Sequence, residues 1–86
     1  MHTVELLEHA LDTAELLGFK IRQDWLGGSG GGACRFKGQK WIFLDLALNP
    51  DEQLDHVAEA IQSDPAIHTL PIAPELRAML KLRKTA

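Results

Sequence analysis

The most conspicuous chemical feature of this chain is a glycine-rich run, Gly27-Gly28-Ser29-Gly30-Gly31-Gly32. From Gly28 to Ala33 the letters match the dinucleotide-binding pattern G-x-G-x-x-A. That pattern holds a pyrophosphate only between a strand and a helix, because the helix N-terminus must face the phosphates. Here an alternating, strand-like segment follows, so we expect no nucleotide site. A second possibility stays open, since the bare backbone N–H groups of such a run can wrap a peptide or an anion.

Nucleophilic and metal-binding side chains are few. Cys34 is the only cysteine, and the alternation of its segment puts it on the same face as Phe36, which predicts a buried and inert thiol. The histidines lack the spacing typical of zinc ligands: His2, His9, His56 and His68. The second and third of these lie opposite the apolar stripes of their predicted helices, which indicates solvated surface positions. We therefore predict no catalytic residue, no metal site and no cofactor.

Basic side chains alternate along two predicted strands. Lys20 and Arg22 share one face of the first, and Arg35 and Lys37 share one face of the second. If those faces coincide, they make a positive patch that could contact RNA. However, residues 1–18 and 49–64 carry several acids and no Lys or Arg, and the net charge is −3. Because phosphate contacts dominate nucleic-acid affinity, we expect weak or absent binding to nucleic acid.

Hydrophobic periodicity predicts the first half of the fold. Apolar residues recur at helical spacing over residues 2–18, with Thr3 as the expected N-cap and Gly18 placed to end the helix. The period then changes to two, which predicts strands at 19–26, 33–37 and 40–46. Gly38-Gln39 suits the two-residue turn of a hairpin, with glycine in the first central position. The last strand is apolar on both faces and should be the best covered.

The second half begins with the clearest helix start of the chain. Asn49 is a good N-cap, Pro50 loses no hydrogen bond at the first helical position, and Glu52 can complete a capping box. The predicted helix covers 50–63, and a short helix is expected at 74–83. Residues 66–73 have little periodicity and are interpreted as a connector.

These elements predict one α+β domain over residues 1–86, in the order α-β-β-β-α-α. We expect a three-stranded antiparallel meander with the helices packed on one face. The chain of 86 residues is 45% hydrophobic and 24% charged, and no apolar run approaches the roughly 18 residues of a membrane span. A single cysteine and an opening without a basic and apolar leader predict a cytoplasmic location.

Two family resemblances follow from the order of the elements. The run from Leu7 to Gln62 resembles the front half of the small zincin-like metallopeptidases of the ImmA/IrrE type, found among small bacterial domains. At the position of their H-E-x-x-H motif this chain reads Ala58-Glu59-Ala60-Ile61-Gln62, so only the glutamate matches. Since those histidines supply two zinc ligands, the resemblance implies a shared scaffold without the metal.

The α-β-β-β-α order also resembles the double-stranded-RNA-binding domain. That family binds phosphates with a basic start to its second helix. Here the corresponding stretch, Asn49-Pro50-Asp51-Glu52, would repel phosphate.

Our first functional hypothesis is a non-catalytic interaction module that binds a protein partner or itself, with homodimers as one possible form. Unpaired strand edges offer a route by strand addition. The candidate partner contacts lie in the glycine run and on the following strand: Gly28, Ser29, Gly30, Gly31, Arg35 and Lys37. The alternatives are a small hydrolase with an unrecognised site and an RNA-contacting protein that uses the basic sheet face.

The missing metal ligands lead to the first testable prediction. Chelator treatment should leave the melting temperature unchanged, because no metal-binding free energy is linked to folding. Differential scanning calorimetry with and without EDTA tests this. A melting temperature that falls by several degrees, or stoichiometric zinc in the purified protein, would contradict it.

Overall fold

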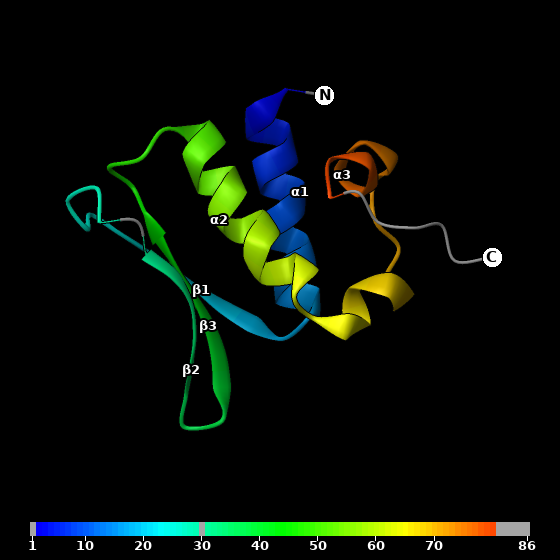
Figure 1. The fold of residues 1–86 in the computed structure, drawn as a ribbon, viewed down its shortest axis with the longest axis horizontal. Coiled ribbons are helices and arrows are strands. Elements are labelled where there is room, and N and C mark those ends of the chain that lie inside the picture. Colours follow the sequence, from blue (N-terminus) through cyan, green and yellow to red (C-terminus); the bar gives the residue numbers. More distant parts are fainter. Residues whose placement is uncertain (1, 30, 81–86) are drawn as a thin grey trace.

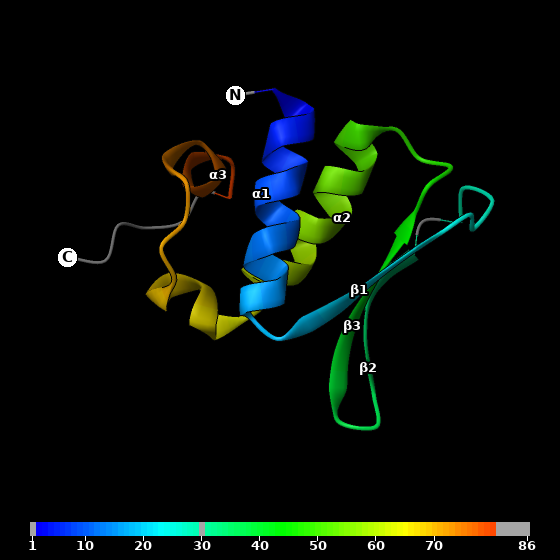
Figure 2. The same ribbon diagram turned by 180° about the vertical axis from the view of Figure 1, so that it is seen from behind.

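The computed structural model describes residues 2–29 and 31–80, which form two layers, with helices over one face of a sheet (Figure 1). The sheet has three strands. The elements in chain order are α1 (Thr3–Leu16), β1 (Phe19–Asp24), β2 (Gly31–Phe36), β3 (Gln39–Asp45), α2 (Pro50–Gln62), the 3-10 helix η1 (Pro65–Thr69) and α3 (Pro74–Met79). The predicted α+β class and the placement of the helices on one face are confirmed (Figure 2).

The strand order differs from the predicted antiparallel meander, which is wrong. The order is β1-β3-β2, with β3 parallel to β1 and antiparallel to β2. The connection between β1 and β2, residues 25–30, is long enough to permit this order. At roughly 3.3 Å per residue this connection can cross two strand spacings of about 4.8 Å each. The chain therefore passes the end of the sheet and leaves room for β3 in the middle.

Burial explains why β3 takes the central place. Ile42 and Leu44 face the helices and are almost completely buried, while Trp41 and Phe43 on the opposite face are half-buried. In β2, by contrast, every residue except Gly32 is exposed. The prediction that the third strand is the best covered is confirmed, and a central position is what covers it.

The hairpin turn between β2 and β3 is displaced by one residue from the prediction. Phe36 pairs with Gln39, so the turn consists of Lys37 and Gly38. Both have positive φ, 50° and 77° respectively, as the type I′ turn requires. Type I′ twists in the same sense as the flanking strands, which is why glycine occupies the second central position rather than the first.

The two long helices lie side by side and run in the same direction (Figure 1). Thr3 does not cap α1 as predicted, because the preceding His2 holds that position. Instead the Thr3 hydroxyl donates to the Asp51 carboxylate, 2.9 Å away, and so links the first turns of α1 and α2. Gly18 follows α1 with φ of 94°, which confirms the predicted end of that helix.

The predicted capping box of α2 is also confirmed. The Asn49 side chain accepts from the Glu52 backbone N–H at 2.9 Å, and the Glu52 carboxylate accepts from the Asn49 N–H at 3.4 Å. These two bonds satisfy N–H groups that the first turn of a helix leaves without partners.

The core lies between the two layers and continues under the C-terminal elements. Its buried apolar residues come from six elements and their ends: Leu7, Ala10, Ala14, Leu17, Phe19, Ile42, Leu44, Leu54, Val57, Ala58, Ala60, Ile61, Ile67, Leu76 and Leu80. The stretch interpreted as a connector contains η1, whose Ile67 is completely buried. Of the predicted helix at 74–83, Pro74–Met79 is observed, and 81–83 lie outside the described residues.

Glycine at position 31 is required by a close backbone approach, and this generates a prediction. A Cβ on Gly31 would lie 2.2 Å from the Phe43 carbonyl oxygen, whereas a Cβ on Gly28 would meet nothing within 4 Å. Both have positive φ, 66° and 81°, so alanine carries a similar backbone penalty of about 1–2 kcal/mol at either site. Gly31→Ala should lower the free energy of unfolding by about 1–3 kcal/mol more than Gly28→Ala.

Urea denaturation of the two variants measures this difference. Gly28→Ala is the matched control, since it isolates the steric clash from the backbone conformation. Equal losses in the two variants would show that β2 does not approach β3 as closely as described.

Candidate functional site

A cleft of about 560 Å³ opens between β2 and α2. Backbone and side chains of residues 31–35 form one wall, and His56 and Glu59 of α2 form the other with Ser63, the residue that follows α2. Lys40 and Phe19 lie at its base, and Asp64 and Pro65 close one end. The cleft thus joins a sheet edge to a helix face that is distant from it in the sequence.

The cleft exists because the first half of β2 has almost no side chains. Gly31, Gly32 and Ala33 present at most a methyl group toward α2. No layer of apolar side chains fills the space above them, so the helix and the strand remain apart. The glycine run therefore keeps the cleft open because it has no large side chains. A ligand in the cleft would contact the backbone of this run.

His56 is the polar group of the cleft with an unmet bonding requirement. The sequence predicted a solvated surface histidine, but the side chain is half-buried. Its Nδ1 is fully shielded and has no hydrogen-bond partner among the described residues. A buried polar atom without a partner costs roughly 1–3 kcal/mol, so native proteins rarely leave one unsatisfied. Because this nitrogen has no exposed surface, a ligand or water in the cleft would supply the partner only if the imidazole ring turned toward it.

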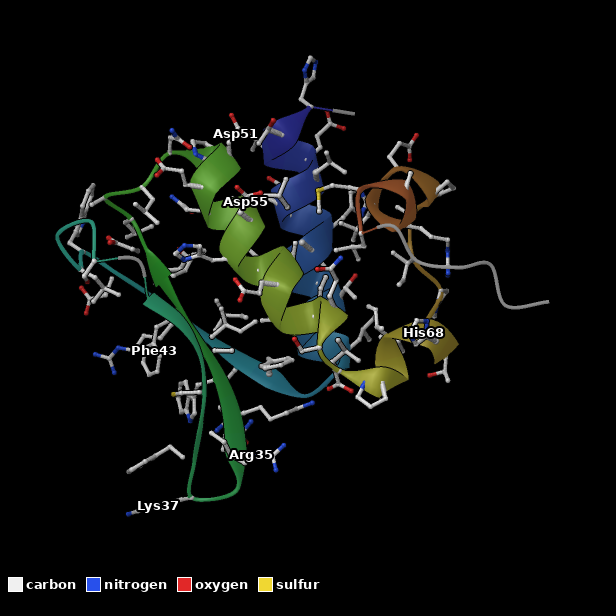
Figure 3. The ribbon with its side chains drawn as sticks, viewed as in Figure 1. Arg35, Lys37, Phe43, Asp51, Asp55 and His68 are labelled. Carbon is white, nitrogen blue, oxygen red and sulfur yellow. The ribbon has the colours of Figure 1, made fainter. Side chains whose placement is uncertain are left out.

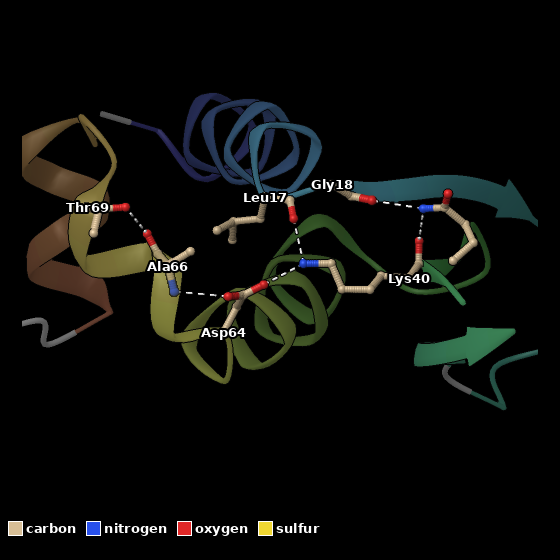
Figure 4. A network of polar contacts seen from close by, with 7 residues as sticks. Leu17, Gly18, Lys40, Asp64, Ala66 and Thr69 are labelled. Atoms are coloured by element: carbon tan, nitrogen blue, oxygen red, sulfur yellow. Dashed lines mark hydrogen bonds and ion pairs between the residues drawn. The ribbon is translucent and has the colours of Figure 1, made fainter. Parts of the chain in front are cut away.

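The base of the cleft is a polar network centred on Lys40 (Figure 4). Its ammonium group donates to the Leu17 carbonyl at the end of α1 and to the Asp64 carboxylate, both at 2.5 Å. The positive charge suits a helix C-terminus, whose carbonyls carry partial negative charge. The hydrogen bond from Lys40, followed by that from the Ala66 N–H, holds the pKa of Asp64 below its ordinary value of 3.8. This network joins β3, α1 and η1.

Among residues 2–29 and 31–80, no strand lies beside the outer edge of β2, because β2 pairs with β3 alone. In a two-residue hairpin the residues that flank the turn bond to each other, and bonding then alternates along the strands. Counting back from Phe36, the backbone N–H and C=O groups of Arg35 and Ala33 point toward the free edge. Since residues 31–35 line the cleft, these groups border it.

The structure separates the candidate contacts that the sequence grouped together. Gly31 and Arg35 line the cleft. Gly28 is exposed in the loop, and the Ser29 hydroxyl is bonded to the Leu26 carbonyl at 2.7 Å. Lys37 lies in the hairpin turn, and Gly30 lies outside the described residues. Sequence reasoning missed His56, because a helical wheel shows only that this residue is off the apolar stripe.

The expected patch of four bases does not form. Arg35 lines the cleft on the helix side of the sheet. Lys20 and Arg22 lie on the outer face, where the Lys20 ammonium is 5.6 Å from the centre of the Trp41 ring. Figure 3 shows Arg35 and Phe43 on opposite sides of the sheet. The register between β2 and β3 decides which β2 side chains face the helices. It places Arg35 on the helix side of the sheet, away from Lys20 and Arg22.

Cys34 and Phe36 are exposed, so the predicted buried thiol is wrong. They do share a face, but it is the outer one, which no helix of the described part of the chain covers (Figure 1 and Figure 2). No group of three or more His, Cys, Asp or Glu side chains in the described part of the chain could hold a metal ion.

The comparisons with known proteins found nothing: no family model, curated protein or solved structure matches the chain. Over the ranges that the structure describes, no helix is both long enough and apolar enough to span a membrane.

The Asp64–Lys40 pair gives a pH-dependent prediction. In the wild type the Ala66 N–H donates to Asp64 Oδ1 at 3.0 Å. Asp64→Asn removes the charge but keeps a side-chain oxygen that can accept this hydrogen bond. At neutral pH the variant should lose about 0.5–1 kcal/mol of unfolding free energy. The pKa of Asp64 is lowered in the folded state. The wild type therefore has the larger free energy of unfolding above about pH 4, and this difference disappears as the pH falls through the folded-state pKa of Asp64.

Urea denaturation of both proteins between pH 7 and the acid limit of folding measures the difference. A difference that stays constant over this range would show that the charge of Asp64 is not what stabilises the fold.

Proposed function

We propose that this protein is a non-catalytic binding module that takes an extended segment of a partner protein as an added strand on β2. The observation that carries the proposal is the unpaired edge of β2 beside a cleft of about 560 Å³. Strand addition gives affinity through main-chain hydrogen bonds, and pockets for alternate side chains give specificity. The free main-chain groups of β2 and the cleft lie side by side on this edge.

The chemistry of the cleft indicates what such a segment would present. A residue of the partner that pairs near Ala33 would direct its side chain toward α2, where His56 and Glu59 line the wall. When its ring turns toward the cleft, the unpartnered His56 nitrogen can bond a polar side chain or a main-chain group. Arg35 at the end of β2 can bond an acidic group farther along the segment. We therefore favour a segment with a polar residue at the centre and an acid beyond it.

The hydrolase alternative has one observation in its favour, because Cys34 and His56 both border the cleft. Strand alternation argues against a Cys34–His56 pair. Cys34 also lines a hollow on the outer face with Phe36 and Trp41, which is where its thiol points. With the sheet between them, His56 cannot act as the base for this thiol, as a cysteine nucleophile requires.

The test is selection of ten-residue peptides from a displayed random library, followed by binding measurements on two variants. Ala33→Pro removes an N–H that points to the free edge and bonds nothing within the sheet, so proline is tolerated there. We expect it to reduce peptide affinity at least about tenfold, the equivalent of one lost main-chain bond to a desolvated group. Ala33→Ser keeps that N–H and serves as the matched control.

Spectra of ¹⁵N-labelled protein locate the bound peptide independently. Amide shifts confined to residues 31–36 and to the cleft side of α2, with a change at the His56 ring nitrogen, are the expected result. Peptides that bind equally well to both variants, or that shift β1 instead, would refute strand addition on β2.

A further inference from the structure

The outer face of the sheet is a second surface, separate from the cleft, and it combines aromatic rings with cations. Trp41 and Phe43 stack with ring centres 6.0 Å apart, and Phe36 is 61% exposed beside them. The ammonium group of Lys20 lies 5.6 Å from the Trp41 ring, and that of Lys37 lies 5.4 Å from the Phe36 ring. We call this surface the aromatic face.

A hollow of about 390 Å³ on the aromatic face could receive an apolar side chain. Its lining is Arg22, Cys34, Phe36, Trp41 and Phe43. The ligand that fits therefore combines an apolar side chain for the hollow with carboxylates that meet the cations of the aromatic face.

The chain itself has a surface of this chemistry on α1. Val4 and Leu16 are 53% and 65% exposed, so each offers apolar surface near one end of the helix. The exposed positions between them are His9 and four acids, and α1 has no Lys or Arg; the acids are Glu5, Glu8, Asp12 and Glu15. We propose that the aromatic face binds α1 of a second copy of this chain.

The dimensions of the two surfaces agree. Three strands about 4.8 Å apart, the longest with seven residues, give a face of about 14 by 23 Å. α1 has 14 residues, so it is about 21 Å long and about 10 Å wide. The aromatic face therefore takes one helix laid across it. Its area is well below the roughly 800 Å² per partner of a stable interface, so the association is weak.

Charge favours this arrangement over a symmetric pairing of two aromatic faces. Face-to-face contact would bring Lys20, Arg22 and Lys37 close to the same three cations of the other copy. These like charges would repel each other. Contact with α1 instead sets these cations against carboxylates. Because each copy then offers one aromatic face and one α1, the contact is head-to-tail and can extend beyond a dimer.

The test uses two charge-reversed variants and sedimentation velocity at roughly 20 mM salt, where surface charges are little screened. Lys20→Glu/Arg22→Glu reverses the aromatic face, and Glu8→Lys/Asp12→Lys reverses α1. Wild type should show concentration-dependent association that declines with added salt. Each variant alone should associate about tenfold less, since like charges now face each other. An equimolar mixture should associate again, because each variant is complementary to the other.

Two further measurements keep the result interpretable. Circular dichroism must show that both variants are folded, and Phe36→Ser, which removes an exposed side chain, should also weaken association. Ala33→Pro should leave association unchanged, which separates this contact from strand addition on β2. A strictly monomeric wild type at low salt, or a mixture that stays monomeric while both variants are folded, would overturn the proposal.

Discussion

The buried carboxylate of Asp45 is the interaction on which the arrangement of this sheet depends. It lies at the end of β3 with no exposed surface, and its Oδ1 accepts from the N–H groups of Leu26 and Ala47 at 3.0 and 2.9 Å. Leu26 belongs to the connection that leaves β1, and Ala47 to the connection that leaves β3. One side chain thus holds both chain segments at the same end of the sheet. Without this anchor, nothing in the glycine run itself would direct the chain past β3 to the far edge.

The strand order that Asp45 helps to hold determines both candidate surfaces. With β3 in the middle, β2 becomes an edge strand whose small residues leave a cleft beneath α2. The same order places Trp41 and Phe43 at the centre of the outer face, with Lys20 on one side and Phe36 on the other. In the expected meander β2 would have been central, and neither the cleft nor the free β2 edge would exist.

Local chemistry could be predicted from the sequence, and pairing between distant strands could not. The capping box at Asn49 and the helix end at Gly18 are decided within a few residues, and both were predicted correctly. The meander prediction assumed that consecutive strands are neighbours, as they usually are. The contact between Asp45 and Leu26 that favours another order joins residues 19 positions apart, and no pattern within one strand reveals it. The errors at Cys34 and His56 follow from the same cause, because their surroundings depend on which edge β2 occupies.

An unpaired edge beside a ligand cleft carries a risk, since any exposed strand can join the strands of other molecules. This edge is regular over only part of its length. Gly31 and Gly32 have φ of 66° and 133°, far from the extended values of a strand, so regular pairing is limited to the segment from Ala33 to Phe36. Within that segment Arg35 adds a charge, which also disfavours strand-to-strand aggregation. Because the edge is short, charged and interrupted, a partner segment binds it well only if the side chains of that segment also fit the cleft. The glycines therefore serve two purposes at once: they open the site, and they keep main-chain bonding alone too weak to capture an arbitrary strand.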